Sequence, residues 1–217
     1  MKENSEIRQG ALALLKGSWG SAVVITLLFH VVIYACNIVA VTLGSALSPV
    51  SSENVLGDVL SILVTVFVCY PMVFAMAKLF LHFVRQEQPL HISAIFKGFS
   101  SSYFGKAVVS YLLISIYTFL WTLLLIVPGI IKGLAYSLTP YILLDNPELS
   151  ADEALNRSMQ LMQGHKMQLF LMVLGFVGLS LLSLLALGIP LLWLYPYYQT
   201  VWAKFYEEVK SSNATVC

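Results

Sequence analysis

Three polar side chains in the first long apolar run have a spacing that suits a shared role. His30, Tyr34 and Asn37 lie at positions i, i+4 and i+7, so a helix presents them on one face. Because polar groups are costly in hydrocarbon, we expect this face to point into a helix bundle. It could form a polar pathway with a titrating histidine, or hold helices together by hydrogen bonds, which is the interpretation we favour.

A second stripe with the same spacing carries positive charge. Lys78, His82 and Arg85 lie at the end of the second apolar run. Basic side chains at such a place attract anionic lipid headgroups, each contributing about 1 kcal/mol. Snorkelling of the long side chains towards water explains the same residues without a bound lipid and is the simpler interpretation.

An aromatic stripe lies near the end of the chain, where Tyr195, Tyr198 and Trp202 gather beside Pro196. Such a face can line a cavity for a lipid tail or a cation. Tyrosine and tryptophan also collect at membrane–water interfaces, and we favour this belt, together with packing, as the explanation.

The sequence carries no recognisable catalytic motif. It has no His-Glu-x-x-His pair, no phosphate-binding Walker loop, no Gly-x-Ser-x-Gly turn and no pair of carboxylates within an apolar run. Helix capping explains the acidic residues Asp145, Glu148, Asp152 and Glu153 better than a metal site does. We therefore expect no enzyme activity, no metal and no cofactor.

The composition is that of an integral membrane protein. Of the 217 residues, 59% are hydrophobic and 11% are charged, whereas soluble domains have about 45–50% apolar and about 25% charged residues. The net charge of +1 provides no basic surface for nucleic acid. We expect membrane lipid as a partner, and a membrane or cytoplasmic protein is a further candidate.

Six apolar runs predict an all-α membrane protein with six transmembrane helices, arranged as three helical hairpins. The fourth and sixth runs are short, and each follows a tight break that contains proline and glycine. The second arm of every hairpin also contains a proline, at Pro71, Pro140 and Pro196. Each proline should kink its helix and leave a carbonyl four residues earlier, such as that of Tyr136, without its helical donor. In order, the runs are Ala22–Leu43, Val55–Phe80, Val108–Val127, Ile130–Leu144, Leu169–Leu187 and Leu191–Trp202.

The basic residues predict the orientation, because lysine and arginine are retained on the cytoplasmic side. Six spans with the N-terminus and C-terminus in the cytoplasm place every lysine and arginine except Lys132 on that side. Outside, only the polar loop Ser45–Gly57 is long enough to bind anything.

Each hairpin is expected to follow a short amphipathic cytoplasmic helix. Three such stretches end at Gly17, Gly98 and Gly164, and glycine suits the left-handed residue at a helix C-terminus. The third stretch begins with a capping box of Ser150 and Glu153. The single polytopic domain, residues 1–217, then divides into hairpin units of about 1–88, 89–147 and 148–217.

Specific motifs lie in the second half of the chain. They are YILLDNPELSADEA from Tyr141, LMQGHK from Leu161, and LWLYPY from Leu192 with the later Phe205-Tyr206 pair. These segments resemble an uncharacterised bacterial membrane family catalogued as domain of unknown function 975, which the first half matches in hydropathy and spacing. The resemblance implies a multi-pass protein of the bacterial plasma membrane and transfers no activity or functional residue.

We therefore predict a non-enzymatic scaffold, regulator or immunity-like protein of the plasma membrane. The alternative is a small-solute or lipid transporter or pore built from proline-kinked hairpins. A third hypothesis, a lipid enzyme, needs reactive groups close to the cationic stripe. The discriminating feature is a hydrated cavity: without a water-accessible path to His30, Asn37 or Tyr198 from either side, the transport hypothesis loses its basis.

Overall fold

The protein is mainly helical in the part that the computed structural model describes, residues 2–47, 55–93 and 101–214. No β-strand occurs within these ranges, which confirms the all-helical prediction. The principal helices are α1 (Asn4–Leu15), α2 (Trp19–Leu47), α3 (Val55–Val64), α4 (Tyr70–Val84), α5 (Ser101–Leu124), α6 (Ile126–Tyr136), α7 (Thr139–Asp145), α8 (Ala151–Leu161), α9 (Lys166–Leu185) and α10 (Leu191–Ala214).

Five helical segments are long and apolar enough to cross a membrane. They are Trp19–Leu47, Val55–Val84, Tyr103–Leu124, Ile126–Asp145 and Lys166–Leu185. The sixth expected span, Leu191–Trp202, forms the first half of α10, which is not among the five. Its second half carries Lys204, Glu207, Glu208 and Lys210, so only half of α10 suits hydrocarbon.

The three prolines of the second arms have different local effects. A π-helical turn, η1 (Thr65–Cys69), precedes Pro71 in the otherwise continuous segment Val55–Val84. Pro140 lies at the start of α7, after a break that separates α6 from α7. There the Thr139 hydroxyl donates a hydrogen bond of 2.7 Å to the Tyr136 carbonyl, the acceptor that the proline leaves without a helical donor. Pro196 lies inside α10, which continues through it.

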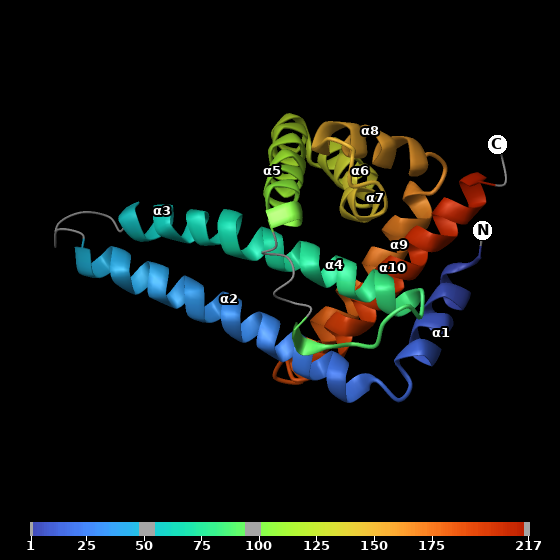
Figure 1. Ribbon diagram of the computed structural model, residues 1–217, viewed down its shortest axis with the longest axis horizontal. Helices are drawn as coiled ribbons and strands as arrows, with labels where there is room; N and C mark the ends of the chain where they lie inside the picture. The colour runs from blue at the N-terminus through green and yellow to red at the C-terminus, as the bar shows by residue number, and fades with distance from the viewer. Residues whose placement is uncertain (1, 48–54, 94–100, 215–217) are drawn as a thin grey trace.

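The long helices contact their neighbours in the sequence: α2 packs along α3, α5 along α6, and α9 contacts α10. In Figure 1, α2 and α3 lie in the plane of the view, whereas α5 and α6 are seen nearly end-on. These two pairs therefore run at a steep angle to each other and do not form one parallel bundle. The α2–α3 approach is close at its outer end, where a Cβ added to Gly44 would lie 2.2 Å from the Gly57 Cα.

The short helices α1 and α8 pack against the longer ones. α1 buries Ile7, Ala11 and Leu15 and contacts α10, and α8 contacts α5, α6 and α7. The capping box of Ser150 and Glu153 at the start of α8 is confirmed. It lowers the pKa of Glu153 through hydrogen bonds from the backbone and the side chain of Ser150.

The glycines expected at the ends of these short helices adopt a left-handed backbone where the structure describes them. Gly17 has φ of +92° and Gly164 has φ of +79°, which confirms the prediction for both. Gly98 lies outside the described residues.

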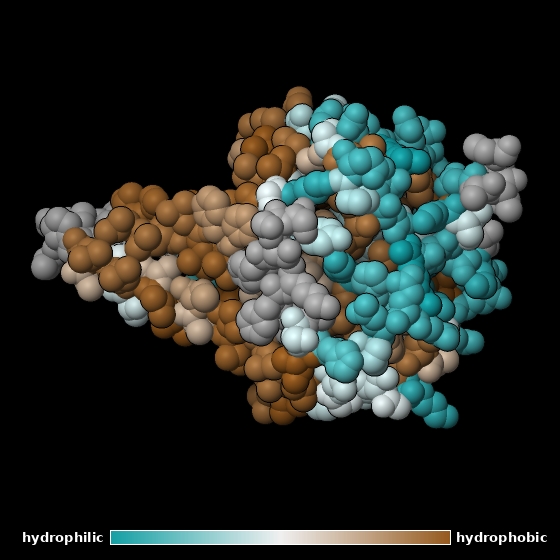
Figure 2. All heavy atoms as spheres, in the orientation of Figure 1, coloured by the Kyte–Doolittle hydropathy of each residue, from teal (hydrophilic) through white to brown (hydrophobic). Residues whose placement is uncertain are grey.

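Hydrophobic and hydrophilic residues occupy different parts of the surface. Figure 2 shows apolar side chains over the arm formed by α2 and α3 and over the α5 region, and hydrophilic ones on the side where both termini lie. The buried core lies at the base of the arm and contains Phe74, Phe80, Phe205 and Tyr206. The apolar surface far from this core is the part suited to lipid.

One contact conflicts with the predicted orientation. The Lys132 amine lies 3.8 Å from the Met159 sulfur, on α8. The six-span orientation predicts Lys132 outside and the α8 helix in the cytoplasm, so these two expectations cannot both be right.

Candidate functional site

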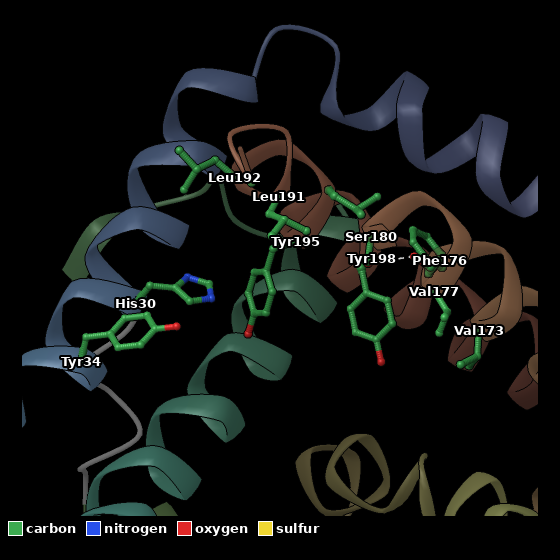
Figure 3. A pocket seen from close by; sticks show the side chains of 12 residues that line it. His30, Tyr34, Val173, Phe176, Val177, Ser180, Leu191, Leu192, Tyr195 and Tyr198 are labelled. Atoms are coloured by element: carbon green, nitrogen blue, oxygen red, sulfur yellow. Dashed lines mark hydrogen bonds between the residues drawn. The ribbon is translucent and has the colours of Figure 1, made fainter. Parts of the chain in front are cut away.

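A cavity of about 500 Å³ lies between α2, α9 and α10. Most of its wall is aliphatic or aromatic, and Figure 3 shows its side chains converging from the three helices. Such a wall suits an apolar ligand whose orientation a few polar groups fix. The polar side chains of the wall are His30, Tyr34, Ser180, Tyr195 and Tyr198.

His30 is held in a defined orientation at the cavity wall. Its Nδ1 lies 2.8 Å from the Thr26 carbonyl oxygen, which can only accept, so we assign the ring proton to Nδ1. In the neutral ring this leaves Nε2 as an acceptor. The ring also meets Tyr195 edge-on, with centroids 4.9 Å apart.

The other two residues of the predicted polar stripe do not share the position of His30. Tyr34 lines the cavity but is 66% exposed, and Asn37 donates a hydrogen bond of 3.0 Å to the Ile33 carbonyl of its own helix. The expectation that all three point into a bundle is wrong for Tyr34, because α3 and α10 cover only part of α2. Asn37 does not line this cavity.

The aromatic stripe of α10 borders two cavities. Tyr195 and Tyr198 line the first, and Tyr198 and Trp202 line a second of about 250 Å³ that also contacts α4, α5 and α7. Phe176 meets Tyr198 edge-on with centroids 5.3 Å apart, and the Tyr198 and Trp202 centroids are 4.8 Å apart. Tyr198 thus stands between the two cavities.

The residues of the cationic stripe have three separate protein partners. The Lys78 amine lies 3.8 Å from the centroid of the Tyr103 ring, and His82 pairs with Glu87. Arg85 binds two carboxylates, at 2.8 Å from Asp145 and 2.6 Å from Glu207. The stripe therefore does not act as one headgroup site.

Arg85 belongs to an ionic cluster that we name the base cluster, formed by Arg85, Asp145, Tyr206, Glu207 and Lys210. Asp145 also accepts hydrogen bonds from the Tyr206 hydroxyl at 2.7 Å and from the Lys210 amine at 2.5 Å. Hydrogen bonding to Asp145 raises the pKa of Arg85, and burial together with the bond to Asp145 raises that of Tyr206. The cluster joins the ends of α4 and α7 to α10.

The base cluster shows that the capping prediction for Asp145 is wrong, and the sequence patterns did not predict this cluster. Asp145 does not cap a helix; it accepts from side chains of two distant segments, with Arg85 60 residues away in sequence. No spacing rule connects residues so far apart. Within the described ranges, no three histidine, cysteine or acidic side chains lie where they could hold a metal ion.

The comparison with family models agrees with the sequence resemblance. A family described as "Protein of unknown function (DUF975)" matches residues 1–132 and, in a second overlapping segment, residues 123–213. No curated protein and no solved structure matches the chain.

Proposed function

We propose that this chain, which belongs to the DUF975 family of proteins of unknown function, is a non-enzymatic scaffold or regulator that holds the acyl chain of a lipid of the bacterial plasma membrane. The acyl chain would occupy the cavity between α2, α9 and α10, next to His30 and Tyr195. Both termini would be cytoplasmic. The protein would act through the bound lipid or through a membrane or cytoplasmic partner.

The observation that carries the proposal is the chemistry of the cavity wall. Val173, Val177, Leu191 and Leu192 supply an apolar lining, and the outer rim continues into exposed side chains such as Val177 and Tyr34. A ligand that enters from the surrounding lipid would therefore pass over mostly apolar side chains. Ser180, one of the few polar groups, donates its proton to the Phe176 carbonyl and offers no free donor.

The same geometry gives little support to catalysis. The His30 ring contacts Tyr195 and Phe29, and no carboxylate of the described residues lines the cavity beside it. A general base needs a partner or a substrate proton within hydrogen-bond reach, and a nucleophile needs such a base. We therefore keep the non-enzymatic interpretation as part of the proposal.

The experiment is to fill the cavity and measure lipid retention. Val177→Trp should displace the acyl chain, and native mass spectrometry of the purified protein should show loss of a co-purifying lipid. Leu174→Trp is the matched control, because Leu174 is on the same helix, is exposed and does not line the cavity. Equal lipid retention by both variants and the unaltered protein would contradict the proposal.

A second candidate, transport of a small solute or a lipid, is favoured by one observation: Tyr198 lines both cavities. Removing this side chain would connect them. In proteoliposomes, Tyr198→Ala should then increase the flux of a lipid or solute probe, whereas Tyr198→Phe should leave it unchanged. A flux at background level in the unaltered protein and in Tyr198→Ala would remove this candidate.

A further inference from the structure

The turns of two hairpins are apolar to an unusual degree. Residues 123–131 cover the end of α5 and the start of α6, and residues 184–194 cover the end of α9 and the start of α10. Neither range contains a charged, hydroxyl or amide side chain. They are also highly exposed, with Leu123 at 73% and Leu187 at 90%. The turn between α2 and α3 is different, since its sequence includes Ser51, Glu53 and Asn54.

The backbone of these apolar turns is hydrogen-bonded within the turn itself. Gly188 N donates to the Ser183 carbonyl at 2.9 Å and Leu191 N to the Gly188 carbonyl at 3.0 Å. In the α5–α6 turn, Gly129 N donates to the Leu125 carbonyl at 3.2 Å. Pro128 and Pro190 have no N–H to satisfy. Such turns tolerate hydrocarbon, where an unpaired backbone group is costly.

A polar helix lies beside the base of the α5–α6 hairpin. The Ser158 hydroxyl of α8 donates to the Ala135 carbonyl at 2.7 Å and accepts from Leu138 N at 3.2 Å, which fixes α8 against α6 and α7. The opposite face of α8 exposes Asp152, Glu153, Asn156, Arg157 and Gln160. This face requires water or headgroups, so the adjoining part of α6, up to Lys132, cannot lie deep in hydrocarbon.

The α6 arm beyond this point is short. From Ile126 to Lys132, α6 rises about 9 Å at about 1.5 Å per residue. The hydrocarbon core of a bilayer is about 30 Å thick, so this length covers little more than half of one leaflet.

The α9–α10 hairpin has the same construction, with α1 as its polar neighbour. Asn4 donates to the Gln168 carbonyl at 2.9 Å, and Arg8 donates to the Met172 carbonyl at 3.2 Å and lies over the Phe176 ring. Beyond Phe176, the segment 177–185 of α9 extends about 14 Å, close to one leaflet of about 15 Å. The charged half of α10 begins at Lys204, so the other arm extends about 20 Å from Leu191 to Lys204.

From these observations we infer that only the α2–α3–α4 hairpin crosses the bilayer, and that the α5–α6 and α9–α10 hairpins enter from the cytoplasmic side and end among the acyl chains of that leaflet. The steep angle between the α2–α3 and α5–α6 pairs in Figure 1 agrees with this arrangement, because both pairs cannot follow the membrane normal. Lys132 then lies on the cytoplasmic side with every other basic residue, which removes the single exception to the positive-inside rule. Two crossings keep both termini on the same side of the membrane. The inference does not depend on which ligand the cavity between α2, α9 and α10 holds.

Cysteine labelling in intact cells tests the inference. In a background with Cys36, Cys69 and Cys217 replaced by serine, the single variants are Ser52→Cys, Arg157→Cys, Leu125→Cys and Leu187→Cys. A membrane-impermeant maleimide added outside should label only Ser52→Cys. In inside-out vesicles it should label only Arg157→Cys, and in detergent it should label all four.

A depth measurement makes the two tip variants decisive. Bimane attached in detergent to Leu125→Cys or Leu187→Cys should, after reconstitution, be quenched by nitroxide on the lipid acyl chain more strongly than by nitroxide on the headgroup. Labelling of either tip from outside the cell would show that its hairpin crosses the bilayer and would overturn the inference. Labelling of either tip from the cytoplasmic side, or stronger quenching by headgroup nitroxide, would also overturn it.

Discussion

The carboxylate of Asp145 accepts hydrogen bonds from Arg85, Tyr206 and Lys210, which belong to two segments far from it in sequence. Its side chain is only 11% exposed, so little water is available to replace a lost partner. Asp145 is the carboxylate that Arg85 and Lys210 share, whereas Glu207 pairs with Arg85 alone. Without Asp145, Lys210 loses its carboxylate partner in the cluster and Arg85 keeps only Glu207.

We predict that Asp145→Asn destabilises the protein by about 2–4 kcal/mol, because removing one member of a largely buried ion pair leaves the other charges uncompensated. The free energy of unfolding in detergent micelles, measured by titration with denaturing detergent, checks this value. Glu148→Gln, an exposed acid-to-amide change on the following loop, is the control and should have no effect beyond about 0.5 kcal/mol.

Ser158 is a second residue whose side chain, although small, should contribute strongly to stability. Its buried hydroxyl is the partner of both Ala135 and Leu138 at the break between α6 and α7. Ser158→Ala should leave one donor and one acceptor unpaired and cost about 1–3 kcal/mol. Hydrogen exchange should increase at the Leu138 amide, whereas Gln160→Ala, on the exposed face of α8, should not change it. Unchanged exchange in Ser158→Ala would contradict this account.

At the scale of elements, two helix contacts depend on the absence of a side chain. A Cβ at Gly175 of α9 would lie 2.2 Å from the Arg8 guanidinium, and one at Gly44 of α2 would lie 2.2 Å from the Gly57 backbone. The first contact holds α1 and the second closes the arm. Close approach through small residues is a common way for helices to pack in membranes.

Gly175→Ala should displace Arg8 and loosen α1 from α9. We expect faster proteolysis within residues 2–16, measured by limited digestion followed by mass spectrometry. Gly178→Ala is the control, because a Cβ at that position of the same helix meets nothing within 4 Å. Equal digestion of both variants would show that Arg8 is not what holds α1.

Gly44→Ala should separate the outer ends of α2 and α3. Since the contact is with backbone and cannot yield by a rotamer change, we expect a loss of about 1–3 kcal/mol in the free energy of unfolding. Gly20→Ala, in the first turn of α2 with open space around it, should be neutral or stabilising by up to about 1 kcal/mol. A stabilised Gly44→Ala variant would contradict the close packing.

At the scale of the whole molecule, the chain separates an apolar region from a polar base, and both termini lie at the base (Figure 2). The depth of each hairpin in the bilayer determines how much a charged residue at its tip would lower the free energy of unfolding. A tip at the outer surface meets water, whereas a tip within a leaflet meets acyl chains. Mutagenesis of the tips therefore distinguishes the two arrangements energetically, independently of labelling.

Leu187→Arg should destabilise the protein in bilayers by about 2–3 kcal/mol, because the arginine would lie close to the centre of the hydrocarbon core. The measurement is the free energy of unfolding in lipid bicelles compared with that in detergent, where the penalty should shrink. Ser52→Arg, in the polar loop of the first hairpin and outside the described residues, should have no bilayer-specific penalty. A Leu187→Arg variant as stable as the unaltered protein in bicelles would favour a tip exposed to water.

Much of the molecule followed from local sequence alone. Apolar runs predicted helices suited to a membrane, Ser150 and Glu153 predicted the start of α8, and Gly17 and Gly164 predicted the ends of two short helices. The motifs around Tyr141 and Leu192 predicted the family that the family model confirms. These features depend on neighbouring residues, whose interactions the spacing along the chain fixes directly.

The contacts between segments were decided by tertiary structure. Spacing along one helix grouped Lys78, His82 and Arg85, but each has a different partner on another part of the chain. The same holds for Asp145, which hydropathy and capping rules assigned to a helix end, and for Lys132, which meets α8. The sequence determined which segments are apolar and helical, because that depends on local composition. The structure decided which length of each apolar segment has no polar helix packed beside it, because that depends on how helices distant in sequence pack together.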